Sequence, residues 1–143
     1  MPIVRPANLV REVLLAEEIC QSLAEFPWRC VTVKMPDGLG TLDDMVAVIE
    51  REDIETGRYV SDANYRLDPH VQIVVRAVGL ARSYEKMREI TAYLDAVHNY
   101  SVSVDGDEYR LISTKRTTNI QFNGVDATGR RYVHTIEYDL VFQ

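Results

Sequence analysis

The stretch HVQIVVRAVGLARSYEKMREITAYLDAV, residues 70–97, decides the fold. In its first part apolar and mixed positions alternate, with Val71, Ile73 and Val75 on one side of the chain. Alternation of this kind with β-branched residues predicts a strand over 71–77. Because the other side of the strand is mixed in character, we expect the sheet to carry helices on one face only.

The second part of the stretch predicts a helix of about four turns. Its apolar residues follow one another at spacings of three and four, which places them on one face of a helix. They are Tyr84, Met87, Ile90, Leu94 and Val97. Gly79 ends the strand, and Ser83 is the predicted N-cap because its hydroxyl can accept a hydrogen bond from a first-turn amide. Asn99 stands where a left-handed residue would end the helix.

The rest of the chain predicts a second helix and further strands. Asn8 is the expected N-cap of a helix that runs to Pro27, with a buried line of Leu9, Val13, Ala16, Cys20 and Leu23. Alternation predicts strands at 28–34, 45–50, 100–104, 109–117 and 132–142, with an Asp105-Gly106 hairpin turn and a polar turn region over 120–131. Residues 51–69 are polar and are expected to form an exposed, adaptable loop that reaches a neighbouring subunit or another partner.

The predicted fold class is therefore α+β. One domain covers residues 1–143, with a mostly antiparallel or mixed sheet of about four or five strands and two main helices packed on one face. The expected core contains Val13, Leu14, Ile73, Val75, Met87, Ile90, Leu94, Ile136 and Leu140. The last strand is apolar along nearly its whole length and ends the chain, so we expect it to offer an unpaired edge to another copy.

Composition and charge exclude some functions. The 143 residues carry a net charge of −6, which argues against a dedicated nucleic-acid binder because such proteins draw most of their affinity from phosphate contacts. No apolar run approaches the roughly 20 residues of a membrane span, and the N-terminus lacks the apolar core of a signal peptide. We therefore expect a cytosol-like compartment and no membrane partner, with Cys20 and Cys30 as free thiols.

No motif predicts catalysis, a cofactor or a metal. The run from Gly124 to Arg130 has the glycine spacing of a phosphate loop, but it lacks the Lys-Ser/Thr ending and leads into a strand. The acidic group around Gly106 has the wrong glycine position for an EF-hand. The histidines at 70, 98 and 134 have no metal-site spacing, and a G-x-S-x-G elbow is absent. We expect the protein not to be an enzyme.

Charged residues supply the candidate interface. Two basic pairs lie in the C-terminal half, and acidic residues gather after the strand at 45–50. The candidates are Lys115, Arg116, Arg130 and Arg131, facing Glu50, Glu52, Asp53 and Glu55 of the next subunit or of a partner. Opposite charges across an interface set register and specificity. The alternative is that these residues form solvated faces with salt bridges inside one chain.

The order of these segments resembles a phage tail terminator protein of the lambda-like, long-tailed phages. The shared run is a strand like VQIVVRA, a helix like SYEKMREITAYLDAV, a polar strand like YRLISTKRT and a last strand like YVHTIEYDLVF. Before the last strand stands a turn with a G-x-D-x-x-G-R pattern, here Gly124, Asp126, Gly129 and Arg130. The resemblance covers roughly 44–142. The proline that family members often have before this turn is replaced here by Ile120-Gln121-Phe122.

The resemblance implies structural work in a virion. Such proteins form a hexameric ring that caps the tail tube, ends its polymerisation and offers a surface to the head-side connector or stopper protein. DNA would pass through the ring without sequence-specific binding, and no cofactor is implied. The protein would assemble in the host cytoplasm, as a monomer before docking, and reside at the tail–neck junction. Two alternatives stay open: another head–tail joining, neck or minor capsid protein, or a small α+β enzyme or ligand-binding domain.

Overall fold

The computed structural model describes residues 5–23, 27–36, 42–50, 69–126 and 128–142. Along the chain the elements are α1 (Pro6–Ala16), β1 (Arg29–Val31), β2 (Met45–Glu50), β3 (His70–Val78), α2 (Leu80–Ala96), β4 (His98–Val104), β5 (Asp107–Arg116), β6 (Gln121–Val125) and β7 (Arg131–Phe142). The α+β prediction with two helices is confirmed. The described part of the chain forms a sheet of seven strands rather than four or five.

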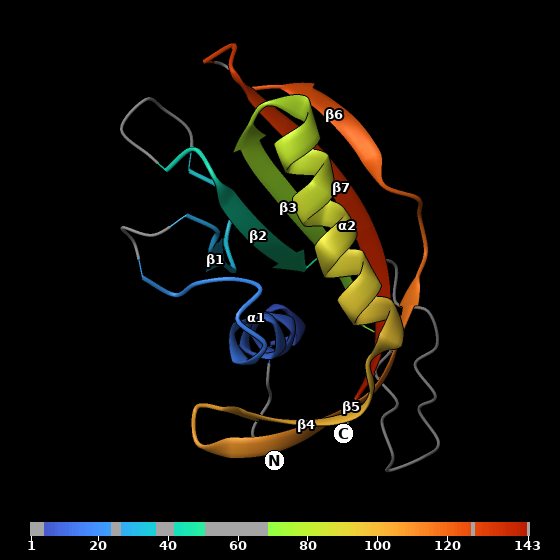
Figure 1. Ribbon diagram of the computed structural model, residues 1–143. Helices are drawn as coiled ribbons and strands as arrows, with labels where there is room; N and C mark the ends of the chain where they lie inside the picture. Colours follow the sequence, from blue (N-terminus) through green and yellow to red (C-terminus); the bar gives the residue numbers. More distant parts are fainter. Residues whose placement is uncertain (1–4, 24–26, 37–41, 51–68, 127, 143) are drawn as a thin grey trace.

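The strands form one mixed sheet that curls around the helices (Figure 1). The order is β1-β2-β3-β7-β5-β4, and β6 also pairs with β7. β1 and β2 run parallel, and the other pairs are antiparallel. α2 lies across β3 and β7, while α1 packs against β2 and β4. Both helices therefore cover the same, concave face of the sheet.

The last strand lies in the middle of the sheet, so the expectation that it offers an unpaired edge is wrong. One side of β7 pairs with β3, from His70 opposite Asp139 to Val78 opposite Arg131. Its other side pairs with β6 along the first half and with β5 along the second half. A strand of 12 residues has room for two shorter strands in line along one side. Its continuous apolar pattern reflects this central position.

The corner between β3 and α2 places the start of the helix four residues earlier than predicted. Gly79 has φ +94°, a conformation that glycine adopts without steric cost, and the helix begins at the next residue. Ser83 is therefore inside the helix and is not its N-cap. The Ser83 amide donates to the Gly79 carbonyl at 3.2 Å, and its buried hydroxyl donates to the Val75 carbonyl at 3.3 Å. Tyr84, placed on the buried line by the sequence, is 43% exposed.

α1 is shorter than predicted and begins before Asn8. Pro6 occupies the first turn, where its fixed φ suits the helix and its missing N–H costs nothing, and Arg5 is the N-cap. The helix ends at Ala16 because Glu18 turns left-handed with φ 59° and the Ile19 amide donates to the Leu14 carbonyl at 3.1 Å. This arrangement is a Schellman motif. The later part of the predicted buried line, Cys20 and Leu23, thus lies outside the helix, and Leu23 is 53% exposed.

The predicted core is confirmed. All nine residues are at most 1% exposed, and they belong to one cluster shared by both helices and the sheet. A smaller cluster of Met35, Met45 and Ala47 lies on the opposite face of β2. The Asp105-Gly106 turn is confirmed by positive φ values at both residues. The region 120–131 was predicted as turn only, but β6 occupies its first half, where Gln121, Phe122 and Val125 pair with β7. The predicted loop at 51–69 lies, apart from Pro69, outside the described residues.

Candidate interaction surfaces

The structure gives several predicted interface residues partners within the chain. Arg130 lies 3.2 Å from Asp43, and Arg116 lies 2.6 Å from Asp95. Glu50 lies 3.3 Å from Arg5 and accepts a hydrogen bond from the Ala7 amide. Lys115 is exposed on β5, and three further candidates, Glu52, Asp53 and Glu55, lie outside the described residues. Arg116 and Arg130 are 40% and 57% exposed in their side chains, so an interface role for them stays a prediction.

Arg131 differs from its neighbour, because it is buried at 1% exposure. Its Nε donates to Asp126 at 2.5 Å, and its Nη1 donates to the Leu42 carbonyl at 3.4 Å. Burial opposes ionisation of Asp126, but hydrogen bonds from Thr128 and Arg131 outweigh it and hold the pKa of this carboxyl below its usual value. The G-x-D-x-x-G-R turn is thus an internal anchor: its aspartate holds the arginine that starts β7.

Arg76 is a second buried guanidinium, also 1% exposed, and its burial was not predicted. It donates to the carbonyls of Pro36 at 2.6 Å and Leu42 at 2.5 Å. Arg76 and Arg131 together tie the chain before β2 to the convex face of the sheet. A signal was present in the sequence, since one arginine interrupts an otherwise apolar run, and such a charge is either solvated or fully paired.

Ser83 and His134 form the one pair among the described residues that resembles a nucleophile and its base. Ser83 Oγ lies 2.7 Å from His134 Nδ1. Ser83 is fully buried and His134 is 4% exposed, and burial lowers the pKa of His134, so the imidazole is neutral at pH 7. A substrate would reach this hydroxyl only by separating α2 from β7. The pair therefore serves as a hydrogen bond between the helix and the sheet.

Exposed apolar side chains gather along one flank of α2, which we call the aromatic flank. It comprises Leu80 at the start of α2, Tyr84 one turn later, Phe122 and Val125 on β6, and the partly buried Tyr132 on β7. Phe122 stacks on Tyr132 with ring centroids 6.0 Å apart and meets His134 at 5.4 Å. β6 pairs only with β7 among the described residues, and its five residues QFNGV carry no charge. Nothing on this edge strand resists pairing or contact with another chain.

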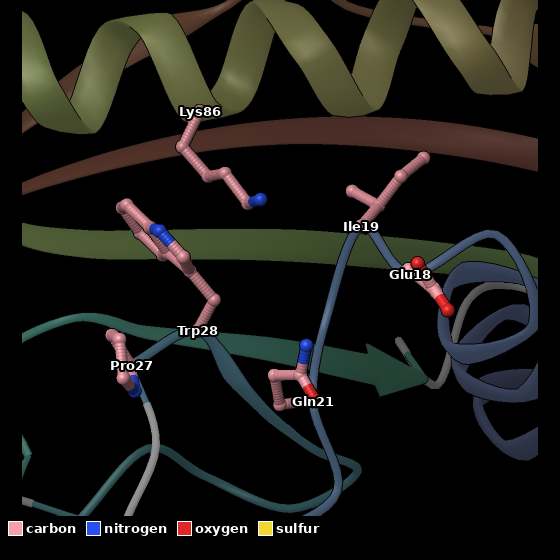
Figure 2. A pocket seen from close by; sticks show the side chains of 6 residues that line it. All are labelled: Glu18, Ile19, Gln21, Pro27, Trp28 and Lys86. Atoms are coloured by element: carbon pink, nitrogen blue, oxygen red, sulfur yellow. The ribbon is translucent and has the colours of Figure 1, made fainter.

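The opposite flank of α2 carries what we call the tryptophan hollow (Figure 2). This open hollow of 290 Å³ is lined by Glu18, Ile19, Gln21, Pro27, Trp28 and Lys86. Lys86 Nζ lies 5.0 Å and the Arg82 guanidinium 5.2 Å from the centroid of the Trp28 ring. Lys86 lies outside the predicted apolar line of α2, yet it is only 8% exposed because its stem lies beside the indole. Arg82 is held in turn by Asp44 at 2.6 Å.

The cysteines, the possible metal ligands and the helices of the described residues give no further candidate site. Cys20 and Cys30 are free and buried, and their mutual hydrogen bond together with burial raises the pKa of the Cys30 thiol. In the described ranges no three histidine, cysteine, aspartate or glutamate side chains come close enough to hold a metal ion. Over the same ranges no helix is long and apolar enough to cross a membrane.

Comparisons with known proteins give no family for this chain. No family model matches it, and no curated protein matches it. Among solved structures it is similar to a chain described as "Virion of native gene transfer agent (GTA) particle", with a TM-score of 0.45 and 14% identity. The similarity covers 80% of this chain and 78% of that chain. A similarity of this degree does not establish a shared family or function.

Proposed function

We propose that the protein is a structural virion component that caps the tail tube of a long-tailed phage as a hexameric ring. In this role it ends tube polymerisation and joins the tail to the head-side connector, and it performs no catalysis. The order β3-α2-β5-β7 supports the proposal, because these elements form where the sequence resembles the strands and helix of tail terminators; β4 and β6 are additional strands. The G-x-D-x-x-G-R pattern begins at Gly124 near the end of β6 and leads into β7, so it stands before the last strand as in the resemblance.

The observation that carries the proposal is where the exposed apolar side chains lie. Seven large hydrophobic residues remain exposed in the described structure, and six of them lie in two places. Four belong to the aromatic flank, and Leu23 and Val33 lie in the segments on either side of β1, at the far edge of the sheet. The seventh, Val78, lies at the end of β3 on the convex face. Contiguous exposed apolar surface marks an interaction site. Two different sites on opposite edges of one chain suit contacts between successive copies.

Contacts between two different surfaces generate rings or filaments, whereas a surface that meets itself generates a dimer. In a closed ring every subunit makes the same two contacts, so no contact surface stays exposed at an end. The net charge of −6 fits a ring whose channel passes DNA, since an acidic protein does not hold phosphates. These features support a closed ring around the tube.

The test is the mass of the protein alone and in the presence of tail tubes assembled from a tail tube protein of the same phage. We expect six copies on each tube end, seen as a single extra ring by electron microscopy, and tubes of limited length when the protein is added during polymerisation. A protein that binds the head connector but never a tube would instead be another neck component. Failure to bind either, with saturable binding of a small molecule, would favour the enzyme or ligand-binding alternative.

A further inference from the structure

The aromatic flank carries a preorganised projecting ring. Phe122 is 52% exposed, yet its ring is held on one side by Tyr132 and His134. A side chain already fixed in place loses little conformational freedom when it binds. It stands on the open edge strand β6, whose neighbouring residues bring no charge that a contact would have to desolvate.

The tryptophan hollow has the walls that such a ring requires. Trp28, Ile19 and Pro27 are apolar or aromatic, and the hollow measures 290 Å³. A cavity of about 150 Å³ suffices for a benzene molecule, so a phenyl ring fits here with space for its backbone. Lys86 provides an ammonium group at 8% exposure, with Glu89 at 3.3 Å as its ion-pair partner. An aromatic face is attracted to such a partly desolvated cation.

The two features lie on opposite sides of the same turns of α2. Arg82 and Lys86 face Trp28, while Tyr84, between them in sequence, contacts His134 on β7 at 5.7 Å. Figure 1 shows β6 on one side of α2 and β1 with β2 on the other. A second copy placed alongside, with its own α2 at the same level, therefore brings its β6 to the hollow of the first copy.

We propose that Phe122 of one copy inserts into the tryptophan hollow of the next copy, against Trp28 and Lys86. The contact is heterologous, since a projection meets a recess, and it repeats around the ring. The inference rests on the proposed ring and adds to it the two surfaces that join neighbouring subunits. Leu23 and Val33, exposed near β1, become covered by the remainder of the aromatic flank.

Site-directed cross-linking tests this contact. One variant carries Val125→Cys, which leaves Phe122 in place on the same strand, and another carries Gln21→Cys, which replaces an exposed residue that lines the hollow. Both are mixed in equal amounts under the conditions that give the ring and treated with a short bis-maleimide. We expect covalent dimers from the mixture and none from either variant alone, because the native thiols are buried. The matched control is Asn123→Cys, also on β6 with its side chain on the face opposite Phe122, which should not cross-link to Gln21→Cys.

Three results would overturn the contact. Cross-linking of the Val125→Cys variant with itself would show that β6 meets β6 in a symmetric dimer. A six-copy ring without cross-links in the mixture would place the subunit interface elsewhere and leave the proposed function standing. A ring whose stability is unchanged by Phe122→Ser would also place the interface elsewhere. We expect instead that Phe122→Ser raises the dissociation concentration of the ring at least tenfold and that Phe122→Leu retains part of the affinity. If no ring forms with or without tail tubes, the proposed function fails first and the contact fails with it.

Discussion

Replacing Asp126 by asparagine should destabilise the fold through the buried Arg131. The side chains of Asp126 and Arg131 are 8% and 1% exposed, and the guanidinium donates to the carboxylate at 2.5 Å. Removing one partner of a buried ion pair costs about 3–5 kcal/mol, because the other charge stays buried. Arg131 keeps the Leu42 carbonyl at 3.4 Å and Asp43 at 3.9 Å, so the lower end of that range applies. We expect a loss of about 3 kcal/mol in the free energy of unfolding.

Urea denaturation of the full chain, followed by circular dichroism, measures this loss, and thermal unfolding should show a midpoint lowered by roughly 10 °C. The change is combined with Arg131→Met in a double-mutant cycle. Because the double variant leaves no unpaired charge, its loss of unfolding free energy should be smaller than the sum of the two single losses by more than about 1 kcal/mol. The control is Arg130→Met, which removes a mostly exposed pair with Asp43 and should change stability by less than about 1 kcal/mol.

The pH dependence gives an independent readout of the same pair. Since the folded state lowers the pKa of Asp126, its stabilising contribution is present above the ordinary pKa of aspartate and is lost as the pH falls through the folded-state pKa. The Asp126→Asn variant should therefore lose less stability than the native chain in acid below about pH 4. The reasoning is refuted if Asp126→Asn leaves stability within about 0.5 kcal/mol of the native chain, or if the cycle is additive.

Four further predictions concern other parts of the molecule. Burial lowers the pKa of His70, but the carboxylates of Asp139 at 2.6 Å and Glu137 at 3.4 Å outweigh it, so the folded state raises this pKa. Stability should therefore fall as the pH rises from about 6 to 8, and His70→Asn should flatten that dependence in urea titrations. Gly79→Ala forces a side chain into φ +94° and should cost about 1–3 kcal/mol, whereas an unchanged unfolding midpoint would remove the strain argument. Cys20 and Cys30 should react with a thiol reagent only upon unfolding, and rapid labelling of the native protein would contradict their burial. Arg130→Glu should weaken ring formation more than folding, as compared by light scattering and thermal unfolding, and an unaltered ring would remove Arg130 from the interface.

The sequence predicts the centre of the fold well because its signals there are local and repetitive. The alternation over 71–77 and the spacing from Met87 to Leu94 each depend on a few adjacent turns or residues, and the structure confirms both. All nine predicted core residues are buried for the same reason. Gly79 shows the limit of this reasoning: the sequence identifies a strand end there, but only the backbone geometry shows that the helix starts immediately and encloses Ser83.

The remaining discrepancies come from long-range pairing, which residue patterns do not encode. The apolar character of β7 is the same for a central strand and for an unpaired edge, and only the arrangement of β5 and β6 along one side distinguishes them. Arg130 and Arg131 are neighbours of the same residue type, so the sequence does not distinguish them. The side chain of Arg130 is 57% exposed, whereas that of Arg131 is buried against Asp126 in the turn that precedes it. Lys86 is buried because Trp28, distant in sequence, packs beside it. The interaction surfaces depend on these distant contacts.

The most direct test of the central claim is the mass of the assembled particle, measured by native mass spectrometry over a range of protein concentrations and again in the presence of tail tubes. We expect a species of six times the 16.4 kDa chain mass, in solution or released from tube ends, with no dimer accumulating on the way. Phe122→Ser should shift this species to the monomer, and that monomer should still unfold cooperatively. A chain that stays monomeric at every concentration and on every tube, or that stops at a symmetric dimer, would contradict the account.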